Sequence, residues 1–229
     1  MEKAPWNKKK KGERKKKDYA KHYRNSPSSI LTKTLAPDIV YTKLKYAVGL
    51  SSTGVGASAV VRLLRGNGPF DPEFIIGGSQ PVGWDQWSEL YNRHCVRGSA
   101  LTINARKSDT GTGAGIVYCV PNWETVTQAN YEATISNPYC KRQILGSSNS
   151  ESVPLTNYIS TAKIFGLEPN QMGSITALCP INTSLPTREW YWDIGLSNLN
   201  GTTTTIDVDL DVEITYYIQF MERKVLSLS

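Results

Sequence analysis

The sequence predicts an all-β fold of about eight strands, arranged as a sandwich or a jelly roll. Short apolar segments recur along the chain, and each is bounded by Gly, Pro, Asn or Ser. The clearest segment lies near the C-terminus, where apolar residues from Ile206 to Phe220 alternate with polar ones, as expected for a half-buried strand. Signals for helices are few.

The expected elements follow in chain order. Strand-like patterns cover residues 43–50, 59–65, 95–106, 115–120, 139–145, 155–165, 189–196 and 206–220. Short helices are expected over residues 84–93 and 125–134, the first with Trp84, Trp87, Leu90 and Tyr91 on one side. Asn200-Gly201 predicts a tight turn before the last strand.

The charge is unevenly distributed over the 229 residues. Lys and Arg number 26 against 20 Asp and Glu, so the formal net charge is +6. Residues 1–24 hold 11 basic and 3 acidic side chains, a net of +8, which leaves a net of −2 for residues 25–229. Because like charges this dense repel, we expect a disordered arm and linker over residues 1–38, a folded domain over 39–222 and a tail over 223–229.

The basic arm is the strongest functional signal in the sequence. Its cations suit neutralisation of a polyanion, and its aromatic side chains can stack on unpaired bases. The expected nucleic-acid-binding residues are Lys3, Trp6, Lys8, Lys9, Lys10, Lys11, Arg14, Lys15, Lys16, Lys17, Tyr19, Lys21, Tyr23 and Arg24. The arm offers no base-specific readout, and the same basic run fits a nuclear localisation signal.

The motifs of several enzyme classes are missing. The chain has no P-loop, G-x-S-x-G or H-E-x-x-H motif, and the G-x-G-x-x-A match at residues 54–59 is followed by a strand-like run where a dinucleotide fold needs a helix. His94 and Cys95 are adjacent on a presumed strand, so they point to opposite faces and cannot form a catalytic pair. We therefore expect neither an enzyme nor a cofactor.

Membrane, metal and disulfide chemistry are also not expected. No apolar run approaches the length of a membrane span, and no apolar segment follows the basic N-terminus as in a secretory signal, so we expect no membrane insertion. With only two histidines, a zinc site is not expected. The widely spaced cysteines are interpreted as reduced core residues: Cys95, Cys119, Cys140 and Cys179.

An acidic row on the last strand leaves three interpretations open. Side chains at i and i+2 of a strand lie about 6.6–6.8 Å apart on one face, so four carboxylates in a line repel one another. They can form a solvated face, a face opposed to basic groups of a neighbouring strand or subunit, or a divalent-cation site. The four residues are Asp207, Asp209, Asp211 and Glu213.

Three segments carry a family pattern. The first is the F-D-P segment within Gly68–Phe74. The second is Q-P-V-G-W-D-Q-W at residues 80–87, which is followed by Leu90-Tyr91 and by V-R-G-S at residues 96–99. The third is V-E-I-T-Y-Y-I-Q-F at residues 212–220. Together with the basic arm, they resemble the capsid proteins of circovirus-like, circular Rep-encoding single-stranded DNA viruses. The arm is Lys-dominated where circovirus arms are Arg-rich, which indicates a related lineage.

The resemblance implies a single eight-stranded jelly roll in two four-stranded antiparallel sheets. Strands B to I would lie near residues 42–50, 58–66, 94–107, 114–121, 139–145, 155–165, 187–197 and 204–222. It also implies a coat protein of a T=1 icosahedral virion that packages circular single-stranded DNA and assembles in the host nucleus. The implied partners are further copies of the chain, the DNA genome, a host nuclear import receptor and a host cell-surface attachment factor of unknown identity.

The arms alone would leave a long genome incompletely neutralised. In such a shell, roughly sixty arms of net +8 supply roughly 480 positive charges, against one negative charge per nucleotide. We therefore expect retained small cations or a contribution from basic residues of the folded domain, namely Arg62, Arg65, Arg106, Lys107, Lys141 and Arg142. An alternative of a different class is a jelly-roll binding module, lectin-like or histone-chaperone-like, with a basic targeting tail, which would form only small oligomers.

Overall fold

The structure, a computed structural model, describes residues 37–56, 59–75, 77, 79–108, 113–124, 134–146, 152–199 and 205–225. The chain divides into two units, Met1–Ala36 and Pro37–Ser229, and every described residue belongs to the second. The predicted arm lies outside the described residues, as do the Asn200-Gly201 turn and all but the last residue of the expected helix at 125–134.

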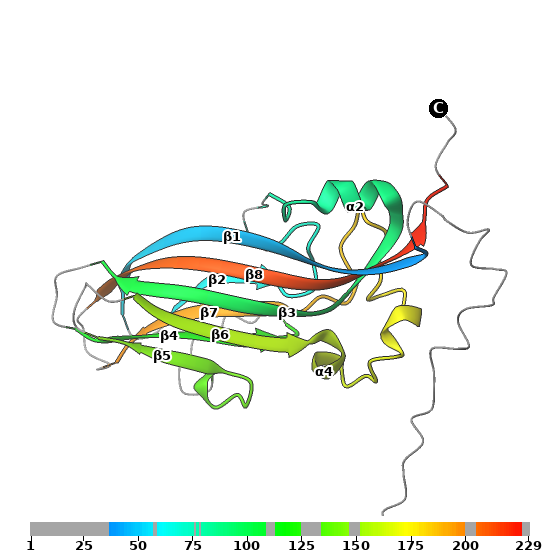
Figure 1. Cartoon of the computed structure of the whole chain (residues 1–229). Coiled ribbons are helices and arrows are strands. Elements are labelled where there is room, and N and C mark those ends of the chain that lie inside the picture. Colours follow the sequence, from blue (N-terminus) through cyan, green and yellow to red (C-terminus); the bar gives the residue numbers. More distant parts are fainter. Residues whose placement is uncertain are drawn as a thin grey trace, which may run out of the picture. The chain divides into compact units, whose positions relative to one another are not determined.

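Eight strands form two four-stranded antiparallel sheets, which lie as two layers (Figure 1). The first sheet has the order β1 (Ile39–Val55), β8 (Ile206–Arg223), β3 (Tyr91–Lys107), β6 (Ser152–Ser160). The second has the order β2 (Ala59–Arg65), β7 (Tyr191–Asn198), β4 (Gly115–Asn122), β5 (Lys141–Leu145). With the strands lettered B to I along the chain, these orders are B-I-D-G and C-H-E-F, so the predicted jelly roll is confirmed.

Strand β8 organises the first sheet, since it lies between β1 and β3 and pairs with both over most of its length. Its apolar residues share one face and are all buried: Ile206, Val208, Leu210, Val212, Ile214, Tyr216, Ile218 and Phe220. Because alternate residues point to opposite faces, the acidic row falls on the outer surface of the same strand. The long partner β8 also extends β1 beyond the predicted 42–50 to Ile39–Val55.

Buried aromatic side chains with polar groups tie the two layers together. Trp192 of β7 donates its Nε1–H to Ser99 Oγ of β3 at 2.9 Å. Tyr216 of β8 donates its hydroxyl to the carbonyl of Arg65 in β2 at 2.7 Å. These bonds satisfy the polar groups of large apolar side chains inside the core, which burial would otherwise penalise.

The Q-P-V-G-W-D-Q-W segment forms the start of helix α2 (Trp84–Leu90). Gly83 precedes it with φ of 87°, a left-handed conformation that favours glycine. Trp84 and Trp87 then pack on Phe220 of β8, with ring centroids 5.6 and 5.7 Å away. The helix ends three residues before the predicted Arg93, because Tyr91 is already extended and begins β3.

The predicted strand at 155–165 is wrong in its second half. Strand β6 ends at Ser160, and Thr161–Phe165 form helix α4. The Ser160 hydroxyl caps the helix by accepting the Lys163 N–H at 3.2 Å, and Gly166 ends it with φ of 64°. A short apolar run does not distinguish strand from helix, so these caps decide the boundary. No helix of the described ranges is long and apolar enough to cross a membrane.

Gly195 of β7 allows a test of how β7 packs against Tyr118 of β4 in the second sheet. A Cβ at this position would overlap the buried ring of Tyr118 on β4. We predict that Gly195→Ala lowers the free energy of unfolding by about 1–3 kcal/mol, measured by chemical denaturation.

The matched control is Gly49→Ala in β1, where an added Cβ meets no atom within 4 Å. This variant should unfold within about 0.5 kcal/mol of the wild type. Equal stabilities for the two variants would contradict the packing of Tyr118 on Gly195.

Candidate nucleic-acid interface

The described chain begins where three strands of the first sheet meet. The Pro37 carbonyl accepts the Tyr91 hydroxyl at 2.7 Å, and Asp38 pairs with Arg223 at 3.9 Å. This attaches the first described residues to the start of β3 and the end of β8. The arm residues expected to bind nucleic acid, Lys3 to Arg24, precede this point and lie outside the described residues, so their role stays a prediction.

The six basic residues expected to contribute from the folded domain do not form one surface. Three are exposed: Arg106 on β3, and Lys141 and Arg142 on β5, in the other sheet. The other three are largely removed from solvent, with exposures of 8% for Arg65, 1% for Lys107 and 15% for the Arg62 side chain. The role expected for all six stays a prediction, although burial leaves Arg65 and Lys107 little access to a polyanion.

Arg65 is committed to holding the F-D-P segment against β2. Its guanidinium pairs with Glu189 at 2.7 Å and with the Asp71 carboxylate at 2.9 Å. It also donates to the carbonyls of Asp71 and Glu73, both at 2.8 Å, and lies 5.2 Å from the ring centroid of Phe74. A buried guanidinium surrounded in this way stabilises the fold, which gives Arg65 a structural role. The nucleic-acid role expected for Arg65 stays a prediction.

Arg62 belongs to the same network through Glu73, whose carboxylate is buried. Tyr46 donates its hydroxyl to Glu73 Oε1 at 2.5 Å, and Arg62 lies 3.3 Å from Oε2. Burial, and then the hydrogen bond to Glu73, raise the pKa of Tyr46 well above its usual value. The tyrosine therefore stays a neutral donor. Arg62 has one carboxylate partner in this network, and its expected nucleic-acid role stays a prediction.

Neighbouring strands of the first sheet supply partners for the acidic row. The interactions are Asp207 with the Gly54 N–H at 2.7 Å, Asp209 with Ser51 at 2.8 Å and Arg106 at 3.4 Å, Asp211 with Asn104 at 3.4 Å, and Glu213 with Lys45 at 2.8 Å. The interpretation of a face opposed to basic groups fits Asp209 and Glu213, which pair with Arg106 and Lys45. Asp207 and Asp211 instead accept from a backbone N–H and a side-chain amide. Among the described residues, no cluster of three or more His, Cys, Asp or Glu could hold a metal ion.

His94 and Cys95 point into different clusters, as their positions predict. His94 is buried between Trp84, whose ring is 4.8 Å away, and Asn182, whose Oδ1 lies 3.1 Å from Nδ1. Burial lowers its pKa to about 4, although the Asn182 bond acts in the opposite direction. Cys95 instead packs with Cys179 in an apolar cluster. The pair therefore offers no nucleophile next to a base.

The cysteine prediction is confirmed at three positions of four. All four thiols are free, and Cys95, Cys119 and Cys179 are buried. Cys140 is only half-buried, because it precedes β5 in the turn where its N–H donates to Asn137. Burial raises the pKa of Cys119 to about 12, so this thiol stays protonated and unreactive.

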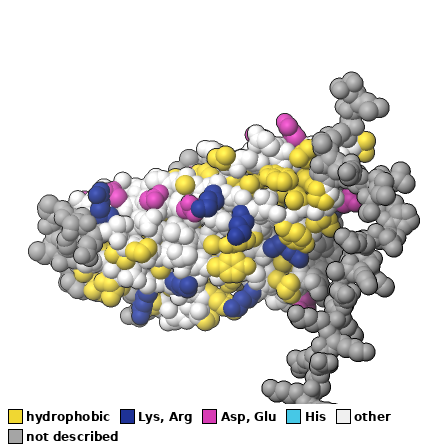
Figure 2. All heavy atoms as spheres, in the orientation of Figure 1, with side chains coloured by type: hydrophobic (Ala, Val, Ile, Leu, Met, Phe, Trp, Pro, Cys, Tyr) yellow, Lys and Arg dark blue, Asp and Glu magenta, His cyan; other side chains and the backbone are white. Residues whose placement is uncertain are grey.

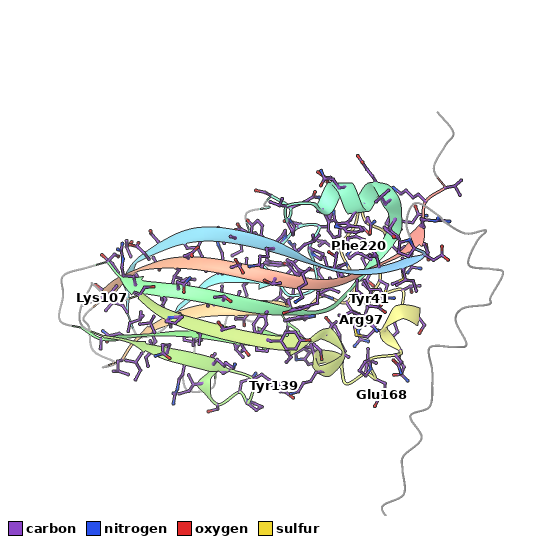
Figure 3. The ribbon with its side chains drawn as sticks, viewed as in Figure 1. Tyr41, Arg97, Lys107, Tyr139, Glu168 and Phe220 are labelled. Atoms are coloured by element: carbon purple, nitrogen blue, oxygen red, sulfur yellow. The ribbon has the colours of Figure 1, made fainter. Side chains whose placement is uncertain are left out.

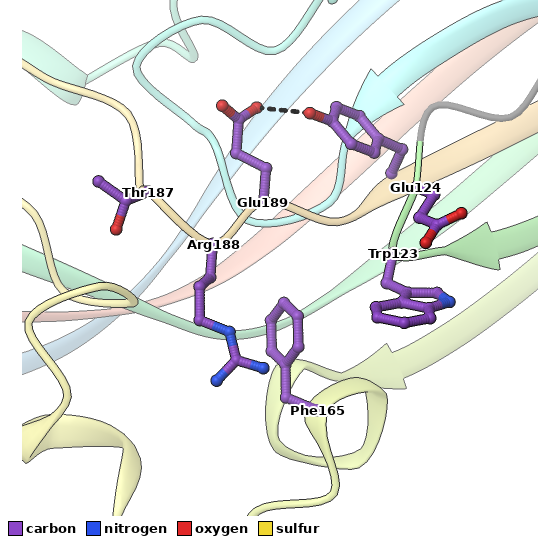
Figure 4. Close-up of a pocket in the computed structure, with 7 residues that line it drawn as sticks. Trp123, Glu124, Phe165, Thr187, Arg188 and Glu189 are labelled. Carbon is purple, nitrogen blue, oxygen red and sulfur yellow. Dashed lines mark hydrogen bonds between the residues drawn. The ribbon is translucent and has the colours of Figure 1, made fainter.

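A hollow of about 630 Å³ lies beside the entry to β7 (Figure 4). Its lining consists of Trp123, Glu124, Phe165, Thr187, Arg188, Glu189 and Tyr191. Glu189 already pairs with Arg65 and accepts the Tyr191 hydroxyl at 3.2 Å, and the Arg188 guanidinium lies 4.5 Å from the ring centroid of Phe165. Among the residues that the structure describes, no His or Cys lines the hollow.

The carboxyl group of Asp193 in β7 is buried and, among the described residues, has one hydrogen-bond partner. It is 0% exposed, and its Oδ2 accepts the Asn122 amide at 3.3 Å. Burial raises its pKa from 3.8 to about 7, and the Asn122 bond only partly offsets that effect. The carboxyl therefore changes charge near neutral pH, inside the second sheet.

No family model and no curated protein matches the sequence. Among solved structures, similar chains include Desmodium yellow mottle tymovirus, at 12% identity and a TM-score of 0.42, covering 87% of this chain and 97% of that one. A decameric BFDV capsid protein is 11% identical, with a TM-score of 0.44 and coverage of 80% and 99%. Tobacco necrosis virus is 12% identical, with a TM-score of 0.45 and coverage of 83% and 85%. At these values, the likeness establishes neither family nor function.

The Arg65 network predicts a large loss of stability when its cation is removed. Arg65→Ala removes two ion pairs to part-buried carboxylates and two hydrogen bonds to backbone carbonyls, so it should lower the free energy of unfolding by about 3–5 kcal/mol, measured by denaturant titration. Arg106→Ala removes an exposed guanidinium paired at 3.4 Å and should cost under about 1 kcal/mol. Similar losses of unfolding free energy in the two variants would contradict the stabilising role assigned to the Arg65 network.

Asp193 predicts a pH dependence of stability. Because its folded-state pKa lies above the ordinary value, the folded protein holds a proton that the unfolded chain releases between about pH 4 and pH 7. The free energy of unfolding should therefore fall as pH rises through this window, and Asp193→Asn should remove that fall.

The measurement is the stability of the wild type minus that of Asp193→Asn across this pH range. His94 acts with the opposite sign between about pH 4 and pH 6.5, because the unfolded chain takes up a proton there. It is present in both proteins, so it cancels in the difference. A difference that stays constant from pH 4 to pH 7 would contradict the prediction.

Proposed function

We propose that the chain is a viral capsid protein that self-assembles into a small T=1 icosahedral shell and packages circular single-stranded DNA through its Lys-rich arm. The observation that carries the proposal is the joining of a B-I-D-G/C-H-E-F jelly roll to a segment of net charge +8 in one chain. Jelly rolls of this kind serve as the walls of viral capsids. The circovirus-like motifs support the choice of lineage and of DNA as the cargo.

The separation of charge suits the two tasks of such a protein. Residues 25–229 have a net charge of only −2, so many copies can pack side by side without a large repulsive cost. The cations of residues 1–24 release counterions when they neutralise phosphates, which favours binding without regard to sequence. A polycationic segment of this kind also fits recognition by a nuclear import receptor, which would direct assembly to the host nucleus.

Deletion of residues 1–24 tests the packaging role of the arm. The truncated chain should keep its fold and still assemble, but its particles should lose most of their nucleic acid, because the chief source of positive charge is gone. Electron microscopy measures assembly, and the absorbance ratio at 260 and 280 nm measures nucleic-acid content.

Two full-length variants are matched controls. Replacing the arm lysines with Gln should reproduce the loss of nucleic acid, whereas replacing them with Arg should preserve packaging. Unchanged nucleic-acid content after deletion would refute the role of the arm. Small oligomers at every salt concentration would refute the capsid proposal and favour the jelly-roll binding module.

A further inference from the structure

The outer face of the first sheet has two chemically different zones. Along β8, the outward residues are acidic from Asp207 to Glu213 and then become Thr215, Tyr217 and Gln219. Over the second zone, Lys and Arg lie among hydrophobic side chains, as the space-filling view of this face shows (Figure 2). We define the tyrosine band as Tyr41, Lys43, Arg97, Tyr139, Lys141, Tyr158, Lys163 and Tyr217.

Contacts between rings and cations link the members of the band across the sheet. Lys43 Nζ of β1 lies 5.1 Å from the ring centroid of Tyr217, and Tyr217 makes an edge-to-face contact with Tyr158 of β6 at 5.5 Å. At the far edge, Lys163 Nζ lies 4.6 Å from the ring centroid of Tyr139. The band therefore places cations beside aromatic rings at both of its ends, with a pair of rings between them.

Small residues of β3 provide the floor between the two central rings. Gly98 is opposite Tyr217, and Ala100 is opposite both Thr215 and Tyr158. A Cβ at Gly98 would lie 2.7 Å from the Ile159 carbonyl oxygen and 3.1 Å from the Tyr158 hydroxyl oxygen. A larger residue at position 98 would thus clash with the β6 backbone and crowd the Tyr158 hydroxyl.

Hollows lie at both ends of the band. The one at β1 has a volume of about 190 Å³ and is lined by Tyr41, Thr42, Lys43, Arg97, Tyr217 and Ile218. Figure 3 labels Tyr41 and Arg97 of this lining. The one beside β5 and β6 has a volume of about 330 Å³, and its lining includes Tyr139, Lys141, Tyr158 and Lys163. Neither lining contains an Asp or Glu, so the cations in them face no carboxylate across the hollow.

The environment of Arg97 indicates that an anionic ligand could bind at the β1 end of the band. Arg97 is the extra residue of a bulge between Val96 and Gly98, and its Nη1 is buried with no hydrogen-bond partner in the described part of the chain. A buried donor of a charged group is costly when it stays unpaired, and a guanidinium binds phosphate oxygens well. Arg97 therefore offers an unoccupied donor where a phosphate could bind.

The rings themselves are available for stacking. Tyr41 is 65% exposed, Tyr158 is 55% exposed and Tyr139 is 39% exposed. Exposed aromatic rings alternating with cations are the features that bind single-stranded nucleic acids, because every base has a face that can stack. Protein–protein contacts are instead depleted in Lys at their centre, which argues against a second copy of the chain as the occupant.

We propose that the tyrosine band is a second nucleic-acid-binding surface on the folded domain, separate from the arm. Arg97 and the lysines contact the phosphates of a single strand, and Tyr41, Tyr158 and Tyr139 stack on its unpaired bases. The choice of nucleic acid as the ligand rests on the proposed packaging function. The band also supplies positive charge from the folded domain, from positions that the sequence alone did not single out apart from Lys141.

The test uses the full-length chain and a labelled oligo(dT), at a salt concentration that weakens the electrostatic contribution of the arm. Tyr41→Ala and Tyr158→Ala should each weaken binding by roughly fivefold or more, since each removes a stacking platform. Tyr41→Phe and Tyr158→Phe keep the rings and should bind like the wild type. Melting temperatures check that each variant remains folded.

Two lysines on the same face of β1 give a matched charge control. Lys43→Ala should weaken binding and reduce the salt dependence by about one counterion, because Lys43 belongs to the band. Lys45 already pairs with Glu213 at 2.8 Å outside the band, so Lys45→Ala should leave oligo(dT) binding close to that of the wild type. Equal effects of the two substitutions would overturn the assignment.

Photo-cross-linking to an oligonucleotide containing 5-bromodeoxyuridine locates the contact. Cross-links to peptides holding Tyr41 or Tyr158 are expected, whereas cross-links confined to residues 1–24 would overturn the inference and leave the role of the arm intact. If the band variants lose nucleic acid but the arm deletion does not, the packaging role of the arm is refuted and nucleic-acid binding by the tyrosine band is supported. Loss of assembly in the tyrosine variants with unchanged DNA affinity would make the band a contact between copies and overturn the inference.

Discussion

The buried guanidinium of Arg65 links the parts of the sandwich that meet at the start of β7. It holds Asp71 and the backbone of Glu73 against β2 and pairs with Glu189, which precedes β7. The backbone carbonyl of the same residue accepts the Tyr216 hydroxyl from the opposite sheet. A charge in this position is tolerated only with partners on every side. The F-D-P segment is therefore held against β2 by Arg65, which gives this arginine a structural role.

Strand β8 shows how one alternating sequence serves two surfaces. Its inner residues fill the core between the sheets, while its outer residues change from carboxylates to Tyr217 along the same face. Cations of β1 and β3 pair with carboxylates of this row, which reduces the net charge of that half of the face. Among the described residues, no carboxylate pairs with the cations of the tyrosine band, although Lys141 donates to the Thr156 carbonyl at 3.0 Å. This difference separates a structural zone from a binding zone on one face.

Most of the fold could be predicted from local patterns. The two-residue alternation of β8 and the turn-bounded apolar runs are local properties, so the eight strands and their approximate limits follow from them. Helix α4 could not be predicted, because the apolar run at 155–165 suits either structure and the Ser160 cap decides between them. The environment of the basic residues was harder to predict, since composition does not reveal that Arg62 and Arg65 pair with carboxylates inside the fold.

By itself, the sequence determined the charge split, the strand pattern and the face on which each residue of β8 lies, because these depend only on composition and on the pleat of a strand. Only the tertiary structure decided which residues of distant strands became neighbours. The tyrosine band draws on β1, β3, β5, β6, β8 and the segments flanking β5 and β6, and its rings meet only because antiparallel register places Gly98 and Ala100 between Tyr217 and Tyr158. Register is a property of paired strands, so no single segment of the sequence carries it.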